Sequence, residues 1–340
     1  MAMVKVPVLG SVFLTVCFLL VSVTTSTHAV RDRLSLPQST LARIESGSAL
    51  FDRVWTLSDG LGPLINAQSC AACHAHPTRG GSTARRDDFV LLSPEVADPT
   101  GGHVFARFDV TPDGPTRLRT LPRASSLRRA PPLFGLGLLE QALVPEESSP
   151  PGSQRTGFGR FGVKARFHSI RDAVVAAFAN ELGLLTTATA GGRRVEVSED
   201  DVRLVTDFVR SLPPLAPTAS VPEGRKVFER IGCGTCHVPT LKISGSAQVT
   251  IAPYSDLRLH DMGKVLSEPW DDGIARGAEF RTTPLWGLSR TGPPYLHDGR
   301  AATVEAAIEF HGGEAESYLV AYRLLSPSDR QQLLRFLKSL

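Results

Sequence analysis

Two short segments of the sequence share one pattern, in which two cysteines flank two other residues and a histidine follows the second cysteine. Two thiols at this spacing can bond to the two vinyl groups on one edge of a porphyrin, and the adjoining imidazole can then bind the iron. The pattern therefore predicts two covalently bound haem c groups. The residues expected to hold them are Cys70, Cys73, His74, Cys233, Cys236 and His237.

Other uses of paired cysteines fit this pattern less well. A thioredoxin-like redox pair does not require the histidine and is not expected twice in one chain. A disulfide across only two residues is strained and stabilises little. A zinc site made of the four cysteines is a further alternative, but the two pairs lie far apart in the sequence and each carries the additional histidine. The complete motif, present twice, favours haem.

The first 29 residues have the composition of an export signal. Lys5 supplies a positive charge, an apolar run extends from 8 to 23, and residues 27–29 form a small-residue cleavage site. An uncleaved membrane anchor is the alternative, but the run is shorter than the ~20 residues that comfortably span a bilayer. We therefore expect a periplasmic protein without a membrane span after cleavage. Cleavage would also remove Cys17, so that every remaining cysteine belongs to one of the two motifs.

Two amphipathic segments, 201–212 and 329–340, resemble each other and are expected to be helices. Both begin with aspartate, carry phenylalanine at the eighth position and end in a basic residue followed by Ser-Leu. Ser198 and Ser326 are the expected N-caps, and a further helix is expected over 167–182. Each closing helix follows one cysteine pair, which indicates two copies of one plan. The expected parts are a signal peptide over 1–29, a domain over 30–214 and a second domain over 215–340.

A histidine ends another expected helix, which covers residues 302–311 and stops at two glycines. One face of this helix carries Val304, Ala307, Ile308 and His311. An imidazole on an apolar face is by default a core histidine with its hydrogen bonds satisfied, but a haem in the same domain needs a second axial ligand. His311 is therefore the expected iron ligand opposite His237. His76, His103 and His168 are expected to have no ligand role.

Further segments make the chain resemble a known family. They are residues 59–64, 79–81, 131–137, 159–162, 228–233, 260–263, 284–287 and 295–300. With the two motifs, they resemble the di-haem oxidoreductases of peroxidase or thiol oxidoreductase type, which are related to the bacterial di-haem cytochrome c peroxidases. The resemblance runs from about residue 45 to the C-terminus. It implies a mainly α fold of two tandem c-type cytochrome domains with irregular insertions, with the haems near the domain interface.

The resemblance also implies roles for particular residues. In the peroxidase relatives an acid in a Glu-Gln-Ala segment assists peroxide cleavage at the N-terminal haem, and Glu140 occupies the matching segment here. Glu140 is therefore the candidate proton shuttle, with an exposed loop carboxylate as the alternative. The distal ligand of the C-terminal haem follows a His-Asp-Gly motif, which again indicates His311, and Met262 is the fallback ligand. Val163 stands where the relatives carry tryptophan, which argues against an aromatic relay at this position.

Two further expectations concern the metal environment and the interface. The N-terminal haem has no identified distal ligand and is expected to be open to peroxide, and Ca²⁺ between the domains is a further cofactor that the resemblance implies. His260, Asp261 and His297 are expected to hold the domain interface and to take no part in the chemistry.

These features together predict an exported di-haem oxidoreductase of peroxidase type. Electrons would pass from a low-spin C-terminal haem to a peroxide-reactive N-terminal haem. The expected partners are a small redox donor protein or a quinol-linked cytochrome, with hydrogen peroxide as the oxidant. A non-enzymatic electron-transfer cytochrome and an oxidase of a protein or thiol substrate are the alternatives. The 37 Lys and Arg residues nearly balance the 34 Asp and Glu residues, so no nucleic-acid partner is expected.

Overall fold

The structure is a computed structural model, and it describes residues 37–85, 88–96, 103–118, 120, 122–123, 125–144 and 159–340. The expected signal peptide lies outside the described residues. Among the helices of the described part, none is both long and apolar enough to cross a membrane.

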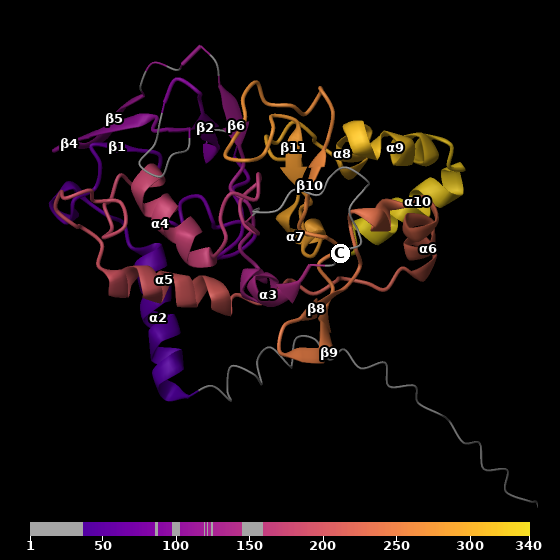
Figure 1. Cartoon of the computed structure of the whole chain (residues 1–340), viewed down its shortest axis with the longest axis horizontal. Helices are drawn as coiled ribbons and strands as arrows, with labels where there is room; N and C mark the ends of the chain where they lie inside the picture. The colour runs from indigo at the N-terminus through magenta and orange to yellow at the C-terminus, as the bar shows by residue number, and fades with distance from the viewer. Residues whose placement is uncertain are drawn as a thin grey trace, which may run out of the picture. The chain divides into compact units, whose positions relative to one another are not determined.

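Helices are the main regular elements on both sides of the predicted boundary at residue 214 (Figure 1). The helices before it are α2 (Gln38–Asp52), α3 (Leu136–Gln141), α4 (Ile170–Glu181) and α5 (Glu199–Ser211). The helices after it are α6 (Pro222–Arg230), α7 (Leu288–Thr291), α8 (Val304–Glu309), α9 (Glu316–Arg323) and α10 (Pro327–Leu337). The expected helices are therefore present as α4, α5, α8 and α10. Three of them, α4, α8 and α10, are shorter than the sequence pattern indicated, whereas α5 begins two residues earlier and ends one residue earlier.

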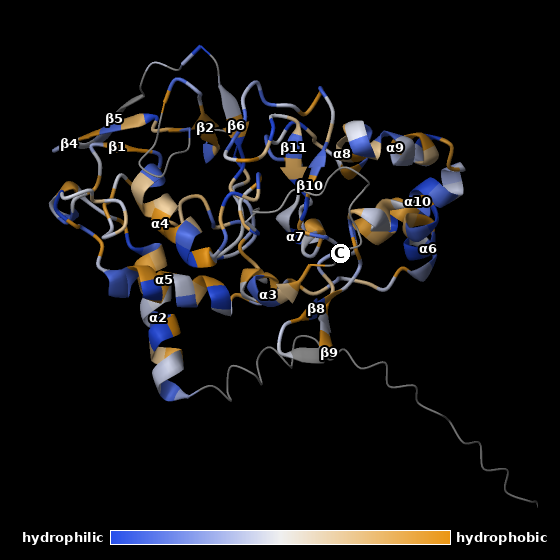
Figure 2. Cartoon of the chain, in the orientation of Figure 1, coloured by the Kyte–Doolittle hydropathy of each residue, from blue (hydrophilic) through white to orange (hydrophobic). Residues whose placement is uncertain are grey.

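The two closing helices begin where their capping residues predict. The Ser198 side chain accepts a hydrogen bond from the backbone N–H of Asp201, and Ser326 does the same for Asp329. These bonds satisfy N–H groups that the first turn of a helix leaves without a partner. Figure 2 shows hydrophobic and hydrophilic residues mixed along α2, α5 and α10, as expected of helices with one buried face.

Short antiparallel sheets occupy the segments between the helices, so the expectation of a mainly α fold is confirmed only in part. The first two sheets have the orders β1 (Leu64–Ile65), β4 (Phe108–Thr111), β5 (Gly114–Leu118) and β3 (Val104–Phe105), β2 (Val90–Leu92), β6 (Ser126–Arg128). The others have the orders β7 (Ala142–Leu143), β8 (Leu241–Ile243), β9 (Ser246–Ile251) and β10 (Leu259–Asp261), β11 (Glu279–Arg281).

The same helix crossing occurs on both sides of the predicted boundary. A Cβ added to Gly47 of α2 would lie 2.0 Å from the carbonyl oxygen of Leu204 in α5. A Cβ added to Gly224 of α6 would lie 2.1 Å from the carbonyl oxygen of Gln332 in α10. Glycine therefore allows the helix that precedes each cysteine pair to approach the closing helix at backbone contact.

Two hydrophobic clusters surround these helix pairs. The larger cluster includes Phe51 of α2, Phe178 of α4 and Phe208 of α5, and the smaller one includes Phe228 of α6 and Phe336 of α10, among other residues. The larger cluster also takes in residues from β8 and β9, and β7 pairs with β8. The two halves of the sequence are therefore joined by a shared sheet, and the boundary at residue 214 stays a prediction.

Candidate haem sites

The second cysteine motif lies beside a cavity of about 310 Å³. The candidate haem residues that line this cavity are Cys233, Cys236, His237, Met262 and His311. The motif follows directly on α6, and a 3₁₀ turn covers Cys233–Thr235. Gly232 introduces this turn with a φ of 87°, and a Cβ at this position would lie 2.6 Å from the Tyr318 ring. A tight backbone turn therefore presents the motif to the cavity.

His237 has the hydrogen bonding of a metal-ligating imidazole. Its Nδ1 lies 2.9 Å from the carbonyl oxygen of Tyr254. Because a carbonyl can only accept, Nδ1 carries the proton and Nε2 keeps a free lone pair. Burial lowers the pKa of His237 to about 4. The imidazole is therefore neutral at ordinary pH, which is the form that binds iron.

His311 lies just beyond the end of α8, on the wall of the same cavity. Its Nδ1 lies 2.8 Å from the carbonyl oxygen of Ala307, so this imidazole also keeps Nε2 free. Burial lowers the pKa of His311 as well. His311 is close enough to His237 to contribute to the lowered pKa of His237. The structure thus brings together the two histidines that the sequence pairs, while Met262 lines the cavity as the alternative ligand.

The histidine of the first motif has the same kind of hydrogen bond to a backbone carbonyl as His237. His74 is partly buried, and its Nδ1 lies 2.9 Å from the carbonyl oxygen of Gly81. The backbone N–H of His74 donates to the carbonyl oxygen of Cys70 at 3.1 Å, which closes a tight turn over the motif. Burial lowers the pKa of His74, and the carbonyl groups of Gly81 and Pro131 partly oppose this effect. Both motifs therefore hold a neutral histidine by a backbone carbonyl.

None of the four cysteines of the two motifs is paired in a disulfide, so all four sulfur atoms could bond to haem vinyl groups. All four are free, and burial raises the pKa of Cys70, Cys73 and Cys233 to about 12. Among the described residues no group of three or more His, Cys, Asp or Glu side chains is arranged to hold a metal ion. Paired cysteines beside a neutral imidazole, at an apolar cavity in the second motif, fit a haem c.

Glu140 lies at the end of α3 and has partners for both carboxylate oxygens. Oε2 accepts from Nε of Arg210 at 2.7 Å, and Oε1 accepts from the backbone N–H of Ile170 at 3.0 Å. Burial alone would raise the pKa of Glu140, but the hydrogen bonds from Arg210 and Ile170 lower it. The carboxylate therefore joins α3 to α4 and α5 and is ionised at neutral pH. Its role as a proton shuttle stays a prediction.

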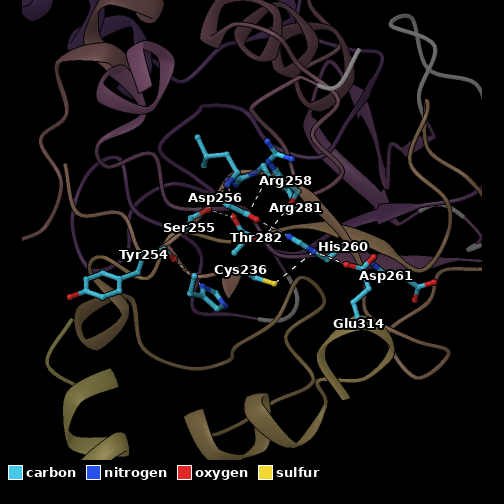
Figure 3. Close-up of polar contacts among 12 residues, drawn as sticks. Cys236, Tyr254, Ser255, Asp256, Arg258, His260, Asp261, Arg281, Thr282 and Glu314 are labelled. Atoms are coloured by element: carbon cyan, nitrogen blue, oxygen red, sulfur yellow. Dashed lines mark hydrogen bonds and ion pairs between the residues drawn. The ribbon is translucent and has the colours of Figure 1, made fainter. Parts of the chain in front are cut away.

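His260 belongs to a buried polar network that the sequence did not reveal (Figure 3). Its Nε2 lies 2.8 Å from Oδ2 of Asp256, and its Nδ1 lies 2.8 Å from Oε2 of Glu314 and 3.7 Å from Sγ of Cys236. Burial would lower the pKa of His260, but the bonds to Asp256 and Cys236 raise it to about 11. Glu314 is distant in the sequence and follows no recognisable motif, so only the fold could bring it here.

His297 also lines the cavity beside the second motif. Its ring stacks on Phe280 with 4.2 Å between the ring centroids, and its backbone carbonyl accepts from the N–H of Arg129 at 2.7 Å. Burial lowers the pKa of His297 to about 4. The side chain is therefore a neutral part of the cavity wall, and its backbone holds the segment that carries Arg129.

Comparisons with known proteins address the family. Residues 189–340 match the family model described as "Di-haem oxidoreductase, putative peroxidase". No curated protein sequence matches the chain. The chain is distantly similar to the structure of hydrazine synthase from Kuenenia stuttgartiensis, with 17% identity, a TM-score of 0.45, and coverage of 88% of this chain and 87% of the other. The chain is also distantly similar to the structure of a MauG-like protein associated with microbial copper homeostasis. The identity is 14%, the TM-score is 0.46, and the match covers 90% of this chain and 91% of the other. Residues 189–340 are therefore similar to the di-haem oxidoreductase family, in agreement with the resemblance that the sequence motifs indicated.

Proposed function

We propose that this protein is an exported di-haem c oxidoreductase that reduces peroxide. One complete cysteine motif and a second histidine line the same cavity. This observation carries the proposal, because together these residues are the ligand set of a six-coordinate haem. The first motif has the same histidine geometry, but no second histidine is paired with it by the sequence. The site at the second motif is therefore suited to electron transfer, and the site at the first motif is suited to substrate binding.

When bound, the haems would supply the redox chemistry, with electron entry at the His237 site and peroxide reduction at the His74 site. The residues of the chain attach and orient them. Each cysteine thiol would add across one vinyl double bond of the haem, with a C–S bond formed and the thiol proton moved to the neighbouring carbon. The carbonyl groups of Gly81 and Tyr254 keep Nδ1 of His74 and His237 protonated, so that Nε2 of each ring would be free to bind iron.

Glu140 is the proposed acid–base group for peroxide cleavage. A proton shuttle must take up a proton at one carboxylate oxygen and release it at a second acceptor. Arg210 occupies Oε2 and favours the ionised form, which suits a group that first accepts a proton from bound peroxide. Transfer would therefore begin with the carboxylate and would loosen the contact between Glu140 and Arg210.

The proposal includes the surroundings of the enzyme. We propose that the mature protein lies in the periplasm, because this location agrees with both the export signal and covalent haem attachment. Its electron donor would be a small redox protein or a quinol-linked cytochrome, and its oxidant would be hydrogen peroxide. Ca²⁺ is also part of the proposal, because the family resemblance implies it.

Optical and electron paramagnetic resonance spectra of the oxidised protein test this function. The protein should be made together with haem-attachment machinery. One low-spin and one high-spin haem, with spectral changes on addition of hydrogen peroxide, are expected. Two low-spin haems that do not react with peroxide would contradict the peroxidase and leave an electron-transfer cytochrome. Reaction with a thiol or protein substrate but not with peroxide would instead identify an oxidase.

A further inference from the structure

Two arginines line the cavity beside the second motif and form no ion pair with a described residue. Arg281 of β11 is 9% exposed, and Arg129 follows directly on β6. Within the described ranges, no carboxylate oxygen lies within 4.0 Å of either guanidinium. Arg128, the neighbour of Arg129, is by contrast paired with Glu268. A buried charge is costly unless an opposite charge accompanies it. The described residues supply no such anion to the buried Arg281 or to the partly buried Arg129.

The Arg281 guanidinium is held in place but not saturated with hydrogen bonds. Nε donates to the carbonyl oxygen of Gly162 at 3.0 Å, and Nη1 donates to that of Thr282 at 3.3 Å. Nη2 donates to no residue in the described part of the chain. Asp256 attracts Arg281 only at longer range, and its Oδ2 is already bonded to His260. Arg281 is therefore fixed at the cavity wall with N–H groups left to donate (Figure 3).

Arg129 is also held by neutral groups alone. Nε donates to the carbonyl oxygen of Thr83 at 3.0 Å, Nη1 to that of Pro294 at 2.7 Å, and Nη2 to that of Thr291 at 3.1 Å. Carbonyl oxygens satisfy its donors but do not neutralise its charge. The one acid among the residues that line this cavity is Glu314, whose Oε2 is bonded to His260. The cavity wall therefore carries an excess of positive charge.

This excess has a chemical counterpart in haem. The two vinyl groups lie on one edge of the porphyrin, and two propionate carboxylates lie on the opposite edge. A guanidinium binds a carboxylate through strong, charge-assisted hydrogen bonds, often two at once. We propose that Arg281 binds a propionate of the haem at the second motif and that Arg129 stabilises the propionate edge by its charge. This inference rests on the proposed haem at His237 and assigns the groups that orient it beyond the thioethers and axial ligands.

Midpoint potentials of the two haems test the proposal. A cation beside a haem stabilises its reduced form, because the reduced form carries one positive charge less. Arg281→Met should therefore decrease the equilibrium constant for reduction of the second-motif haem about tenfold, which is 59 mV for a one-electron couple. The potential of the first-motif haem should not change and serves as an internal reference. The second-motif couple is identified as the one missing from a variant that carries Cys233→Ser and Cys236→Ser.

Resonance Raman spectra supply a readout that a purely structural arginine would not change. The propionate bending band of the second-motif haem should shift in Arg281→Met. If that variant does not fold, Arg281→Lys should still shift the band while leaving the potential near that of the wild type, since it keeps the charge but not the guanidinium. Arg171→Met, at an exposed ion pair with Glu199, is the matched control and should change neither property.

The outcomes separate this inference from the proposed function. An unchanged band and potential in a folded Arg281 variant, or a shift confined to the first-motif haem, would overturn the assignment while the haem protein remained established. A protein that carries no haem after expression with haem-attachment machinery would instead overturn the function on which the assignment rests.

Discussion

The three candidate iron ligands share one local device. In His74, His237 and His311 the Nδ1 atom lies 2.8–2.9 Å from a backbone carbonyl oxygen, so each ring is fixed in the tautomer that leaves Nε2 free. Two of the carbonyls belong to loops that follow a motif, and the third belongs to the preceding turn of α8. One such hydrogen bond could belong to an ordinary core histidine. Three of them, at the two cysteine motifs and at the cavity beside the second motif, indicate a shared role as iron ligands.

Replacement of His311 tests its assignment as an axial ligand. His311→Ala should convert the low-spin haem of the second motif to a high-spin form, because the iron loses its sixth ligand while the thioethers keep the haem in place. Optical and electron paramagnetic resonance spectra report this change. His168→Ala, at an exposed residue, is the control and should leave both spectra unchanged. A low-spin spectrum retained in His311→Ala would instead favour Met262 as the ligand.

Replacement of Glu140 separates a proton shuttle from a structural ion pair. Glu140→Gln should decrease the rate of peroxide reduction about 100-fold, since it removes the group that accepts the proton. Arg210→Gln removes the same ion pair but keeps the carboxylate, so it should retain most of the activity. Steady-state rates with hydrogen peroxide distinguish the two. Equal losses in both variants would show that Glu140 acts through its contacts with α5 alone.

At the scale of elements, the sequence predicts the helices better than the strands. The helices α4, α5 and α10 follow from apolar spacing and serine caps, and these signals lie within a few residues of one another. The described strands are two to six residues long, too short for a clear alternation of buried and exposed residues. Strands β7 and β8 pair across nearly a hundred residues of sequence, which no local pattern can reveal.

Some residues of the candidate site could likewise be predicted from the sequence, and others could not. The cysteine motifs are contiguous, and His311 ends a helix with a recognisable apolar face, so both could be predicted. Asp256, Glu314 and Arg281 could not, because their importance depends on which side chains the fold places beside them.

The glycine crossing of α6 and α10 gives a prediction for stability. Gly224→Ala should lower the free energy of unfolding by roughly 1–3 kcal/mol, because the added Cβ would lie 2.1 Å from the carbonyl oxygen of Gln332. Chemical denaturation measures this loss. Gly234→Ala is the matched control, since its Cβ would have no neighbour closer than 3.8 Å. Equal stability of the two variants would contradict the close approach of the helices.

On the scale of the whole molecule, a buried ionic cluster joins segments from both halves of the sequence. Arg128 of β6 donates through Nε to Oε1 of Glu268 at 2.6 Å, and Nζ of Lys164 lies 3.5 Å from Oε2 of the same residue. The side chains of Lys164 and Glu268 are nearly inaccessible to solvent. Removing one charge from such a cluster leaves the others uncompensated, so its integrity should be important for stability.

Glu268→Gln should therefore lower the free energy of unfolding by about 3–5 kcal/mol at neutral pH. Glu199→Gln, at the exposed pair with Arg171, is the control and should cost less than about 1 kcal/mol. Chemical denaturation of both variants measures the difference. A loss at Glu268 no larger than at Glu199 would contradict a buried, mutually dependent cluster.

The same cluster predicts a dependence of stability on pH. Burial alone would raise the pKa of Glu268, but Arg128 and Lys164 lower it below its ordinary value of 4.5. A carboxylate with a lowered pKa in the folded state stabilises the protein above the pKa of the unfolded state. This contribution is lost as the pH falls from about 4.5 through the folded pKa. The difference in stability between the wild type and Glu268→Gln should therefore shrink in acid, and a difference that grows would contradict the sign of the shift.

The central claim is that the two cysteine motifs together bind two haems covalently. Intact-mass spectrometry of the full chain under denaturing conditions tests this claim most directly, because only covalently bound groups remain attached. After expression with haem-attachment machinery, the account predicts a mass equal to that of the polypeptide, with or without its signal, plus two haems. A polypeptide that carries one haem, or none, would contradict it.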